Sequence, residues 1–561
     1  MSIEKAHHWA AAAIDESDAQ VVLQAIEGAR AQELAFTQEL EAMFSGPLKF
    51  GTAGLRARIG AGESQMNTSV VARATWGLGT WLVNAKAKSV VVCYDARKKS
   101  DVFAQVTAEV FSAQGLITYL SPQALPTPVL AYAVPHLGAG AGVMITASHN
   151  PRDDNGYKVY LQDGCQIAPP VDSEIAVLIE QAPNANRIAR NSSLIRSWPN
   201  EVWLSYIKDA AAFITKAQAE NSPETNSAPK WVYTPMHGVG AATLQAVIKE
   251  ISWPQPLVVK TQATPDGQFP TLPFPNPEEE GALSEAIKTA QTNDVSLIVA
   301  NDPDADRCAI AVRRGETWRQ LTGDEVGALL AQKIIEISKE SSGSSPAKVL
   351  ATTLVSSTLT SKMAASHDFT TATTLTGFKW IGRIPGLVYG YEEALGYCGD
   401  PVNVKDKDGI TAALLAIQIN SEAFATGKDL IDLLDEIYLQ YGLHYTSTRS
   451  TRFESVDQAT EIIASLALNP PKVVASLPVR DFTDLTRGWH HLPPTSGVLF
   501  YLGESVRVII RPSGTEPKVK TYLEVVYPPR QASLTADKAA AAELSDRVHA
   551  ALRESMSCPT P

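Results

Sequence analysis

Apolar residues near the N-terminus recur at the spacing of an amphipathic helix. Between residues 17 and 44 the apolar positions that follow this spacing are Val21, Val22, Ile26, Leu34, Leu40 and Met43. The segment ends at Ser45-Gly46-Pro47, a combination that stops helices. The pattern predicts one amphipathic N-terminal helix that covers the first domain.

Short apolar runs then alternate with helical stretches along most of the chain. The first series is strand-like SVVVCYDARK, helical DVFAQVTAEVFSAQG and strand-like GAGVMITASHN. Strand-like KWVYTP and SLIVANDPDADRCAIAV bound a second series, and helical LTGDEVGALLAQKIIEI with strand-like VLATTLVSS begins a third. This order is typical of βαβ units, so it predicts an α/β fold with largely parallel sheets and with the chemistry at the strand ends.

The last part of the chain has a different pattern. Strand-like VRVIIRPS and KVKTYLEVVY precede an Ala-rich helical segment, which predicts a smaller α+β domain. The 561 residues exceed the size at which one hydrophobic core stops growing, so several domains are expected. We predict four domains, over residues 1–205, 206–321, 322–448 and 449–561.

Composition narrows the class of protein and of partner. Apolar residues make up 45% of the chain and charged residues 19%, as in globular proteins. The formal net charge is -12, so the overall field repels polyanions, and we expect no nucleic-acid or membrane partner. The five cysteines form no CxxC pair, and no signal peptide or membrane-length apolar run is recognisable. We therefore expect a cytoplasmic protein.

The segment TASHNP (146–151) follows the strand-like run GVMI and therefore places the hydroxyl of Ser148 where a strand ends. A serine at such a site can carry a phosphoryl group covalently if positive charge stabilises the group during transfer. A serine in a turn of this kind is more often a capping or turn residue. The motif therefore needs partners before it indicates chemistry.

An acidic loop follows the apolar run VSLIVA. In NDPDADR (301–307), Asp302, Asp304 and Asp306 occupy alternate positions, so in an extended loop their carboxylates project to one side. Three hard oxygen donors suit Mg²⁺, and without a cation they would repel one another. One alternative is an Asp-rich surface turn. A calcium loop is disfavoured because the required glycine and the glutamate at its twelfth position are missing.

A third loop, RPSGTEPK (511–518), lies between two strand-like runs and is rich in hydrogen-bond donors. Small residues let backbone N–H groups approach an anion, and Arg511 supplies a planar fork that matches phosphate oxygens. The loop predicts a phosphate site, with a plain turn between strands as the alternative. Two weaker features are GTAGLR (51–56) and YDAR (94–97), of which the second could position a charge or form an ordinary surface pair.

Together and in this order, these segments resemble the α-D-phosphohexomutase superfamily, which includes phosphoglucomutases, phosphomannomutases and related phosphopentomutases. The resemblance extends from Gly51 to about Glu524. It implies four domains around a central cleft. Three α/β/α domains would supply the phosphoserine, metal and sugar loops, and a smaller C-terminal α+β domain would supply the phosphate loop.

The resemblance also implies a reaction. Ser148 is similar to the family's phosphorylated serine, and Asp302, Asp304 and Asp306 to the ligands of one Mg²⁺ per chain, with a phosphoserine oxygen completing the site. Phospho-Ser148 would give its phosphoryl group to a free hydroxyl of a sugar monophosphate, the bisphosphate would turn around, and Ser148 would take back the other phosphate. A sugar bisphosphate would act as the primer.

Three further residues carry over as catalytic. Arg56 resembles an active-site arginine near the exchanged phosphate, and His149 directly follows the serine. Lys158 is the candidate general acid/base. It follows Asn155-Gly156, which predicts a turn that folds YKVY back as a hairpin strand. An ordinary solvated lysine on a strand face is the alternative for Lys158.

Substrate contacts are implied for two loops and the segments beside them. Arg307 resembles a second arginine near the exchanged phosphate. The residues that resemble the clamp on the nonreacting phosphate are Arg511, Ser513, Gly514, Thr515 and Lys518. The residues implied for the sugar loop and its flanking segments are Thr376, Gly377, Lys379, Glu392 and Lys407.

The sugar loop GYEEALGY (390–397) departs from the pattern of many hexomutases, in which a glutamate and, two residues later, a serine contact sugar hydroxyls. Glu392 is kept, but Ala394 takes the serine position, so one hydroxyl contact is missing. With TGFKW (376–380) and DKDG (406–409), the loop resembles the branch that contains mammalian-type phosphoglucomutase 2 and phosphopentomutase. We expect interconversion of glucose 1- and 6-phosphate, with ribose or deoxyribose 1- and 5-phosphates or mannose phosphates as alternatives.

Two other functions stay open at this point. A glucose-1,6-bisphosphate synthase would use the same motifs but take its phosphoryl group from a donor such as an acyl phosphate. A noncatalytic sugar-phosphate binding protein would not require the serine, the three aspartates and the phosphate loop together. We expect a mutase, which is an isomerase, that acts on small phosphosugars as a monomer or a dimer.

Overall fold

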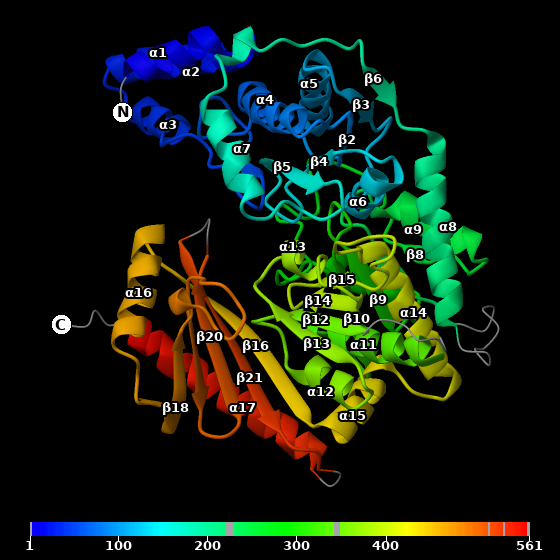
Figure 1. Cartoon of the computed structure of the whole chain (residues 1–561). Helices are drawn as coiled ribbons and strands as arrows, with labels where there is room; N and C mark the ends of the chain where they lie inside the picture. Colours follow the sequence, from blue (N-terminus) through cyan, green and yellow to red (C-terminus); the bar gives the residue numbers. More distant parts are fainter. Residues whose placement is uncertain (1–2, 219–228, 341–347, 514–516, 531–532, 558–561) are drawn as a thin grey trace. The chain divides into compact units, whose positions relative to one another are not determined.

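The structure is a computed structural model that describes residues 3–218, 229–340, 348–513, 517–530 and 533–557. Figure 1 shows the whole chain coloured along the sequence. The chain divides into two units. The first unit comprises Met1–Leu321 and Gly396–Ala425, and the second comprises Thr322–Leu395 and Thr426–Pro561. The four predicted domain ranges stay a prediction.

Residues 3–43 form three helices, so the prediction of a single N-terminal helix is wrong. They are α1 (Ile3–Ala12), α2 (Glu16–Arg30) and α3 (Leu34–Met43). Gln32 has a left-handed φ of 61°, and the chain reverses there so that α3 packs on α2. Gly28 permits this close approach, because a Cβ at that position would lie 2.3 Å from the Phe36 ring. The apolar faces of the helices form a small core with Ala61.

The first sheet follows the predicted βαβ order, with strands arranged β1-β5-β4-β2-β3-β6. The strands are β1 (Leu55–Arg58), β2 (Ser89–Tyr94), β3 (Ile117–Leu120), β4 (Ala141–Ile145), β5 (Asp154–Leu161) and β6 (Ile195–Ser197). β2 pairs parallel with β3 and β4, whereas β5 pairs antiparallel with β4 and β1. Strands β2 and β4 are apolar and buried almost throughout, as expected of strands covered on both faces.

Helices flank the first sheet, and one long helix follows them before the second sheet. Those of the first sheet are α4 (Thr68–Asn84), α5 (Ser100–Ala113), α6 (Thr127–His136), α7 (Val171–Glu180) and the short 3₁₀-helix η1 (Ala185–Arg187). The long helix α8 (Asn200–Ala217) follows and packs against α6. Apolar residues from α4, α5 and the central strands form one large core that supports the ends of β2 and β4.

Asn155-Gly156 is not a turn, so that prediction is wrong. Both residues lie inside β5, in the part of the strand that pairs with β1. The Asn155 Nδ2 donates to the Lys98 carbonyl at 3.0 Å and to Ser100 Oγ at 2.9 Å. These contacts and the pairing with β1 hold an extended backbone, so tertiary structure overrides the local preference. Lys158 nevertheless lies on a strand.

The second sheet has the order β11-β10-β9-β7-β8. Its strands are β7 (Val232–Thr234), β8 (Leu257–Val258), β9 (Leu297–Asn301), β10 (Cys308–Arg314) and β11 (Thr317–Gln320). The associated helices are α9 (Gly240–Glu250), α10 (Ser284–Thr292) and α14 (Gly409–Ala425), the last preceded by β15 (Gly396–Cys398). β9 and β10 pair antiparallel, so the acidic segment between them is a tight hairpin connection at the end of buried β9.

The second unit begins with a parallel arrangement in which β12 lies between β13 and β14. These strands are β12 (Val349–Thr353), β13 (Thr370–Thr374) and β14 (Leu387–Glu392). The helices of this part are α11 (Gly323–Glu340), α12 (Leu359–Ala365), α13 (Phe378–Ile381) and α15 (Leu430–Tyr441). The predicted helix and strand of the third series are therefore confirmed.

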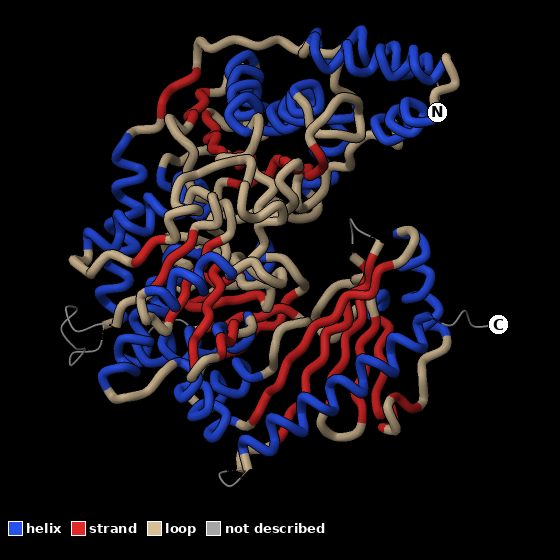
Figure 2. The backbone as a smooth tube through the Cα atoms, turned by 180° about the vertical axis from the view of Figure 1, so that it is seen from behind, coloured by secondary structure: helices blue, strands red, loops and turns tan. Residues whose placement is uncertain are grey.

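A six-stranded antiparallel sheet of order β16-β21-β20-β19-β18-β17 completes the second unit. Its strands are β16 (Leu443–Arg452), β17 (Val473–Val474), β18 (Leu477–Asp484), β19 (Val498–Leu502), β20 (Val506–Pro512) and β21 (Lys518–Tyr527). Its helices are α16 (Val456–Leu468), η3 (Leu485–Arg487) and α17 (Leu534–Ser557). The predicted Ala-rich terminal helix is α17, which lies across β16 and β21 (Figure 2).

Glu524, on β21, connects the two sheets of the second unit through its buried carboxylate. Oε1 accepts from the Thr358 N–H at 2.7 Å and from Ser357 Oγ at 2.8 Å, both after β12. Arg507 Nη2 lies 2.9 Å from Oε2, and His444 Nδ1 lies 3.0 Å from Oε1. Burial opposes ionisation, but Arg507 and the hydrogen-bond donors lower the pKa of Glu524 to about 2.

Replacing Glu524 by Gln should destabilise the protein in a pH-dependent way. A carboxyl whose folded-state pKa is depressed from 4.5 to about 2 stabilises the fold above pH 4.5, and this contribution is lost as pH falls toward 2. The shift corresponds to roughly 3 kcal/mol. We expect Glu524→Gln to lower the free energy of unfolding by about that amount at pH 7, as measured by urea denaturation.

The difference in free energy of unfolding between Glu524→Gln and the wild-type protein should become smaller as pH falls from 4.5 toward 2. Glu504→Gln is the control, because Glu504 pairs with Arg480 at the surface and should contribute little. An equal difference in free energy of unfolding at pH 7 and pH 3 would contradict a stabilising role for the ionised Glu524 carboxylate.

Candidate active site

Ser148 opens the loop that follows β4, and its side chain is buried. Its φ is 52°, a left-handed conformation that costs a non-glycine residue about 1–2 kcal/mol. The Ser148 N–H donates to Thr146 Oγ1 at 2.8 Å. Its Oγ donates to Asp302 Oδ2 at 2.8 Å and lies 3.2 Å from His149 Nδ1. The loop therefore directs the hydroxyl toward the acidic segment, as a functional serine requires.

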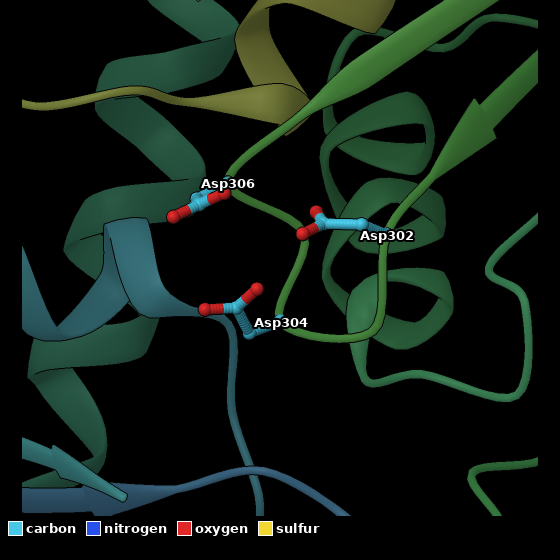
Figure 3. Close-up of side chains that lie close together, drawn as sticks. All are labelled: Asp302, Asp304 and Asp306. Carbon is cyan, nitrogen blue, oxygen red and sulfur yellow. The ribbon is translucent and has the colours of Figure 1, made fainter. Parts of the chain in front are cut away.

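The carboxylates of Asp302, Asp304 and Asp306 converge from one loop (Figure 3). All three are buried, and one oxygen from each lies within 4.8 Å of the others. Ala305 has a left-handed φ of 54° and its N–H donates to the Asp302 carbonyl at 2.9 Å, which closes the turn that brings the carboxylates together. The alternate spacing seen in the sequence thus produces a cluster.

This cluster passes a test for a divalent cation. Within the described residues, Oδ1 of Asp304 and Oδ1 of Asp306 are buried and have no hydrogen-bond partner. Buried carboxylate oxygens without partners are unfavourable, and a cation bound between them would remove that cost. Hard oxygen donors are the ligands that Mg²⁺ prefers. The residues present therefore fit a magnesium ion.

Two buried ammonium groups offset part of the negative charge of the cluster. Burial and the neighbouring Asp304 and Asp306 charges hold the pKa of Asp302 well above its usual range. Burial also opposes ionisation of Asp304 and Asp306, but Lys158 Nζ lies 2.7 Å and 3.0 Å from their Oδ2 atoms and holds both pKa values below the usual range. Lys407 Nζ lies 3.5 Å from Asp306 Oδ2. The predicted acid/base residue is therefore not a solvated lysine.

Thr127 is a member of the site that the sequence does not reveal. Its hydroxyl donates to Asp304 Oδ2 at 2.6 Å, and its N–H donates to the Asp304 carbonyl at 2.9 Å. The residue begins α6, and nothing in its local sequence distinguishes it from an ordinary first helical residue. Lys407 was predicted to contact the sugar, and its ammonium lies beside Asp306 and Asp406.

The other predicted residues of the first unit surround the serine. Arg56 Nη1 donates to Asn150 Oδ1 at 2.9 Å, and the Arg307 N–H donates to Asp302 Oδ1 at 3.0 Å. Removal from water lowers the pKa of His149 well below its usual range, and the charges of Arg307 and Arg56 lower it further. The imidazole beside Ser148 is therefore neutral at pH 7, in a region where arginine charge can stabilise an anion.

The predicted phosphate and sugar residues of the second unit contact one another. Arg511 Nη1 donates to Thr376 Oγ1 at 2.7 Å, and Arg511 Nη2 donates to Thr495 Oγ1 at 3.4 Å. The Gly377 N–H donates to Glu392 Oε1 at 2.6 Å. The arginine of the phosphate loop and the glutamate of the sugar loop are therefore both bound by the adjacent residues Thr376 and Gly377.

The remaining residues of these loops are only partly described. The Ser513 N–H donates to the Lys518 carbonyl at 2.8 Å, which starts the connection between β20 and β21. Lys379 lies in the short helix α13. Gly514 and Thr515 lie outside the described residues. Ala394 lies in the turn after β14 and brings no hydroxyl to it.

Comparison with known proteins identifies the family of this chain. The models of phosphoglucomutase/phosphomannomutase α/β/α domains I, II and III match residues 47–186, 205–315 and 322–441, and the model of the C-terminal domain matches residues 458–542. The chain belongs to the phosphoglucomutase/phosphomannomutase family. Its predicted α/β class and four-domain architecture are thereby confirmed.

Members of the phosphoglucomutase/phosphomannomutase family with several names are similar to the chain. A Haemophilus influenzae protein named "Probable phosphomannomutase" is 41% identical, over 82% of this chain and 93% of its own length. The phosphoribomutase of Saccharomyces cerevisiae is 37% identical, over 87% of each chain. The crystal structure of a family protein from Burkholderia thailandensis, 16% identical, covers 93% of this chain and 99% of its own with a TM-score of 0.68, and so shares the fold.

Membership of this mutase family confirms the predicted enzyme class. The chain is a phosphosugar mutase, hence an isomerase, and its substrates are phosphosugars. The phosphoglucomutase/phosphomannomutase family is Mg²⁺-dependent, in agreement with the buried aspartate cluster. Among the helices that the structure describes, none combines the length and the apolar character needed to cross a membrane.

The metal assignment can be tested by replacing Asp304 with Asn, which keeps the side-chain volume but removes one anionic ligand. We expect binding of Mn²⁺, used as a spectroscopic probe for the Mg²⁺ site, to weaken at least ~10-fold, as measured by electron paramagnetic resonance of the free ion. Asp324→Asn, at a buried aspartate of the second unit, should bind Mn²⁺ like the wild-type protein. Unchanged affinity in Asp304→Asn would remove the aspartate cluster as the metal site.

Proposed function

We propose that the chain moves a phosphoryl group between two hydroxyls of one sugar by way of Ser148. The observation that carries this proposal is the 2.8 Å contact between Ser148 Oγ and Asp302 Oδ2, at the edge of the buried aspartate cluster. A phosphate on this oxygen would lie among donors and cations suited to an anion, including Arg56 and Arg307.

The surrounding residues would share the work of phosphoryl transfer. A Mg²⁺ held by Asp302, Asp304 and Asp306 would supply charge neutralisation for the transferring group. Burial lowers the pKa of Lys158, but the two carboxylates raise it by more, so the side chain stays an ammonium. We assign Lys158 the movement of a proton between the attacking and the leaving oxygen.

The second unit would hold the phosphate that does not react. Two phosphate sites are needed, because each phosphate of a sugar bisphosphate must occupy each site in turn. We assign the nonreacting phosphate to Arg511, Ser513 and Lys518, together with Gly514 and Thr515. Arg511 supports the assignment because Thr376 and Thr495 orient its guanidinium.

For the sugar, we propose that pentose phosphates are turned over beside glucose phosphates. Ala394 offers no hydroxyl where many hexomutases have a serine, so the loop selects less strongly for a hexose hydroxyl. We assign Glu392, whose Oε1 accepts from the Gly377 N–H, as one acceptor of sugar hydroxyls. The similarity to a phosphoribomutase supports ribose 1- and 5-phosphate as the pentose pair, and the similarity to a protein named for mannose keeps mannose phosphates in the test.

Replacing Ser148 by Ala should abolish turnover while leaving the fold intact. With Mg²⁺ and a catalytic amount of glucose 1,6-bisphosphate, we expect the rate of glucose 1-phosphate conversion to fall at least ~10⁴-fold, because the covalent carrier is lost. The measurement is phosphorus NMR of the reaction mixture. Ser112→Ala removes a buried serine hydroxyl bonded to Asn191 in the same sheet domain and should retain wild-type turnover. Undiminished turnover in Ser148→Ala would refute the mechanism.

The same NMR experiment separates a mutase from a bisphosphate synthase. A primed mutase converts the 1-phosphate to the terminal phosphate without net change in bisphosphate. A synthase accumulates bisphosphate, and only when a phosphoryl donor such as an acyl phosphate is added. Offering glucose, ribose and mannose 1-phosphates in turn ranks the substrates.

The role of Ala394 predicts a change of selectivity. Ala394→Ser should raise kcat/KM for glucose 1-phosphate relative to ribose 1-phosphate by about five-fold, the effect of one hydrogen bond of about 1 kcal/mol. Competition between the two substrates, followed by NMR, measures the ratio directly. Ala394→Cys is the control, because a thiol has a shape similar to that of the serine hydroxyl but is only a weak hydrogen-bond donor. It should leave the ratio of the two kcat/KM values unchanged. If Ala394→Ser and the wild-type enzyme have the same ratio of kcat/KM values, position 394 does not select the sugar.

A further inference from the structure

Arg97 binds the Ser148 loop through four backbone carbonyls. Its Nη2 donates to the carbonyls of Ser148 and Asn150, both at 2.6 Å. Its Nη1 donates to the carbonyls of Pro151 and Asp154 at 2.8 Å and 3.1 Å. Only 3% of Arg97 is exposed, so the YDAR segment does not form the surface pair that its sequence allows. A planar guanidinium can hold four carbonyls in one fixed arrangement, which a lysine cannot do.

Asp95 supports the amide side of Ser148 through Thr146. Its Oδ1 accepts from the Arg97 N–H at 3.0 Å and from Ser100 Oγ at 2.7 Å. Its Oδ2 accepts from the Thr146 hydroxyl at 2.7 Å and lies 3.5 Å from Arg97 Nε. Since Thr146 Oγ1 accepts the Ser148 N–H, the backbone N–H and C=O of Ser148 are both held by a network that begins at Asp95.

Arg97 also contacts the domain that carries the acidic loop. Its guanidinium lies over the Phe269 ring, 5.0 Å from the ring centre, and its backbone forms a parallel bridge with Gly267. Phe269 is buried, with 1% exposed. Both residues belong to the segment between β8 and β9, and β9 ends where the acidic loop begins. Arg97 therefore contacts both the Ser148 loop and the domain that carries Asp302.

We propose that Arg97 is a positioning residue for phosphoryl transfer. The left-handed backbone at Ser148 is unfavourable for a serine and persists only when its surroundings hold it. Arg97 holds this conformation from the carbonyl side and fixes the loop relative to the segment that carries Phe269. This keeps Ser148 Oγ against Asp302 Oδ2. The assignment rests on the proposed function of Ser148 as phosphoryl carrier.

Arg73 offers a matched control, because it makes the same kind of contact away from the serine. Its Nη1 donates to the carbonyls of Ala182 and Pro183, both at 2.8 Å, and its Nη2 donates to the carbonyl of Ile179 at 3.2 Å. These carbonyls lie at and beyond the C-terminal end of α7, in the same sheet domain. Arg73 is half-buried, whereas Arg97 is buried. If carbonyl binding by an arginine contributes only stability, the two arginines should behave alike.

The test compares Arg97→Lys with Arg73→Lys in the full-length protein. Lysine keeps the charge but replaces the fork with a single nitrogen. We expect Arg97→Lys to slow phosphorylation of Ser148 by glucose 1,6-bisphosphate and to lower kcat by ~100-fold, with KM nearly unchanged. Rapid quench and intact-protein mass spectrometry measure the phosphorylation rate. Arg73→Lys should lower the melting temperature while phosphorylation stays at the wild-type rate.

Several outcomes would overturn the assignment. A wild-type phosphorylation rate in Arg97→Lys would do so, as would losses of rate in both variants that follow their melting temperatures. If Arg97→Lys does not fold, Asp95→Asn tests the same network and should slow phosphorylation at least ~10-fold, and a wild-type rate there would equally overturn it. Absence of phosphate on Ser148 in the wild-type protein would refute the proposed function itself, and it would appear before any variant is compared.

Discussion

Three carboxylates from one five-residue segment are buried side by side, and the rest of the site follows from that constraint. Like charges removed from water cannot stay ionised without compensation. Lys158 and Lys407 provide part of it, and Thr127 and Ser148 donate hydrogen bonds to the same carboxylates. The negative charge that binds the Ser148 hydroxyl is the same charge that would attract a cation. The fit for a cation and the position of Ser148 Oγ both come from this single concentration of negative charge.

The acidic loop could be predicted from the sequence because its geometry is local. Alternate aspartates between two apolar runs need only a tight connection to converge, and β9 and β10 supply it. The partners of the loop could not be predicted in the same way. Thr127 lies 177 residues from Asp304, and the hydrogen bond between them depends on how two sheets pack. The Arg97 carbonyl contacts likewise depend on the path of a loop 51 residues away, so YDAR stayed ambiguous.

The wrong predictions have the same physical origin. Asn155-Gly156 has the local preference of a hairpin turn, but pairing with β1 and two side-chain hydrogen bonds keep it extended. The N-terminal apolar positions do lie on helices, and Val22, Ile26, Leu40 and Met43 share one core across a reversal at Gln32. Val21 and Leu34 are exposed. In both cases the local pattern omits the packing partner, which is a separate segment: β1 for Asn155-Gly156, and α3 for the apolar face of α2.

The antiparallel pairing of β4 and β5 has a consequence for how the site tolerates change. Ser148 follows the end of β4, and Lys158 lies on β5 directly opposite Met144. The pairing of the two strands therefore sets the spacing between Ser148 and Lys158. An insertion in the connecting loop would leave this strand pairing unchanged. Deleting one residue from β5 ahead of Lys158 would turn the Lys158 side chain to the opposite face of the sheet. The spacing of the two side chains therefore constrains the length of β5 but not the length of the connecting loop.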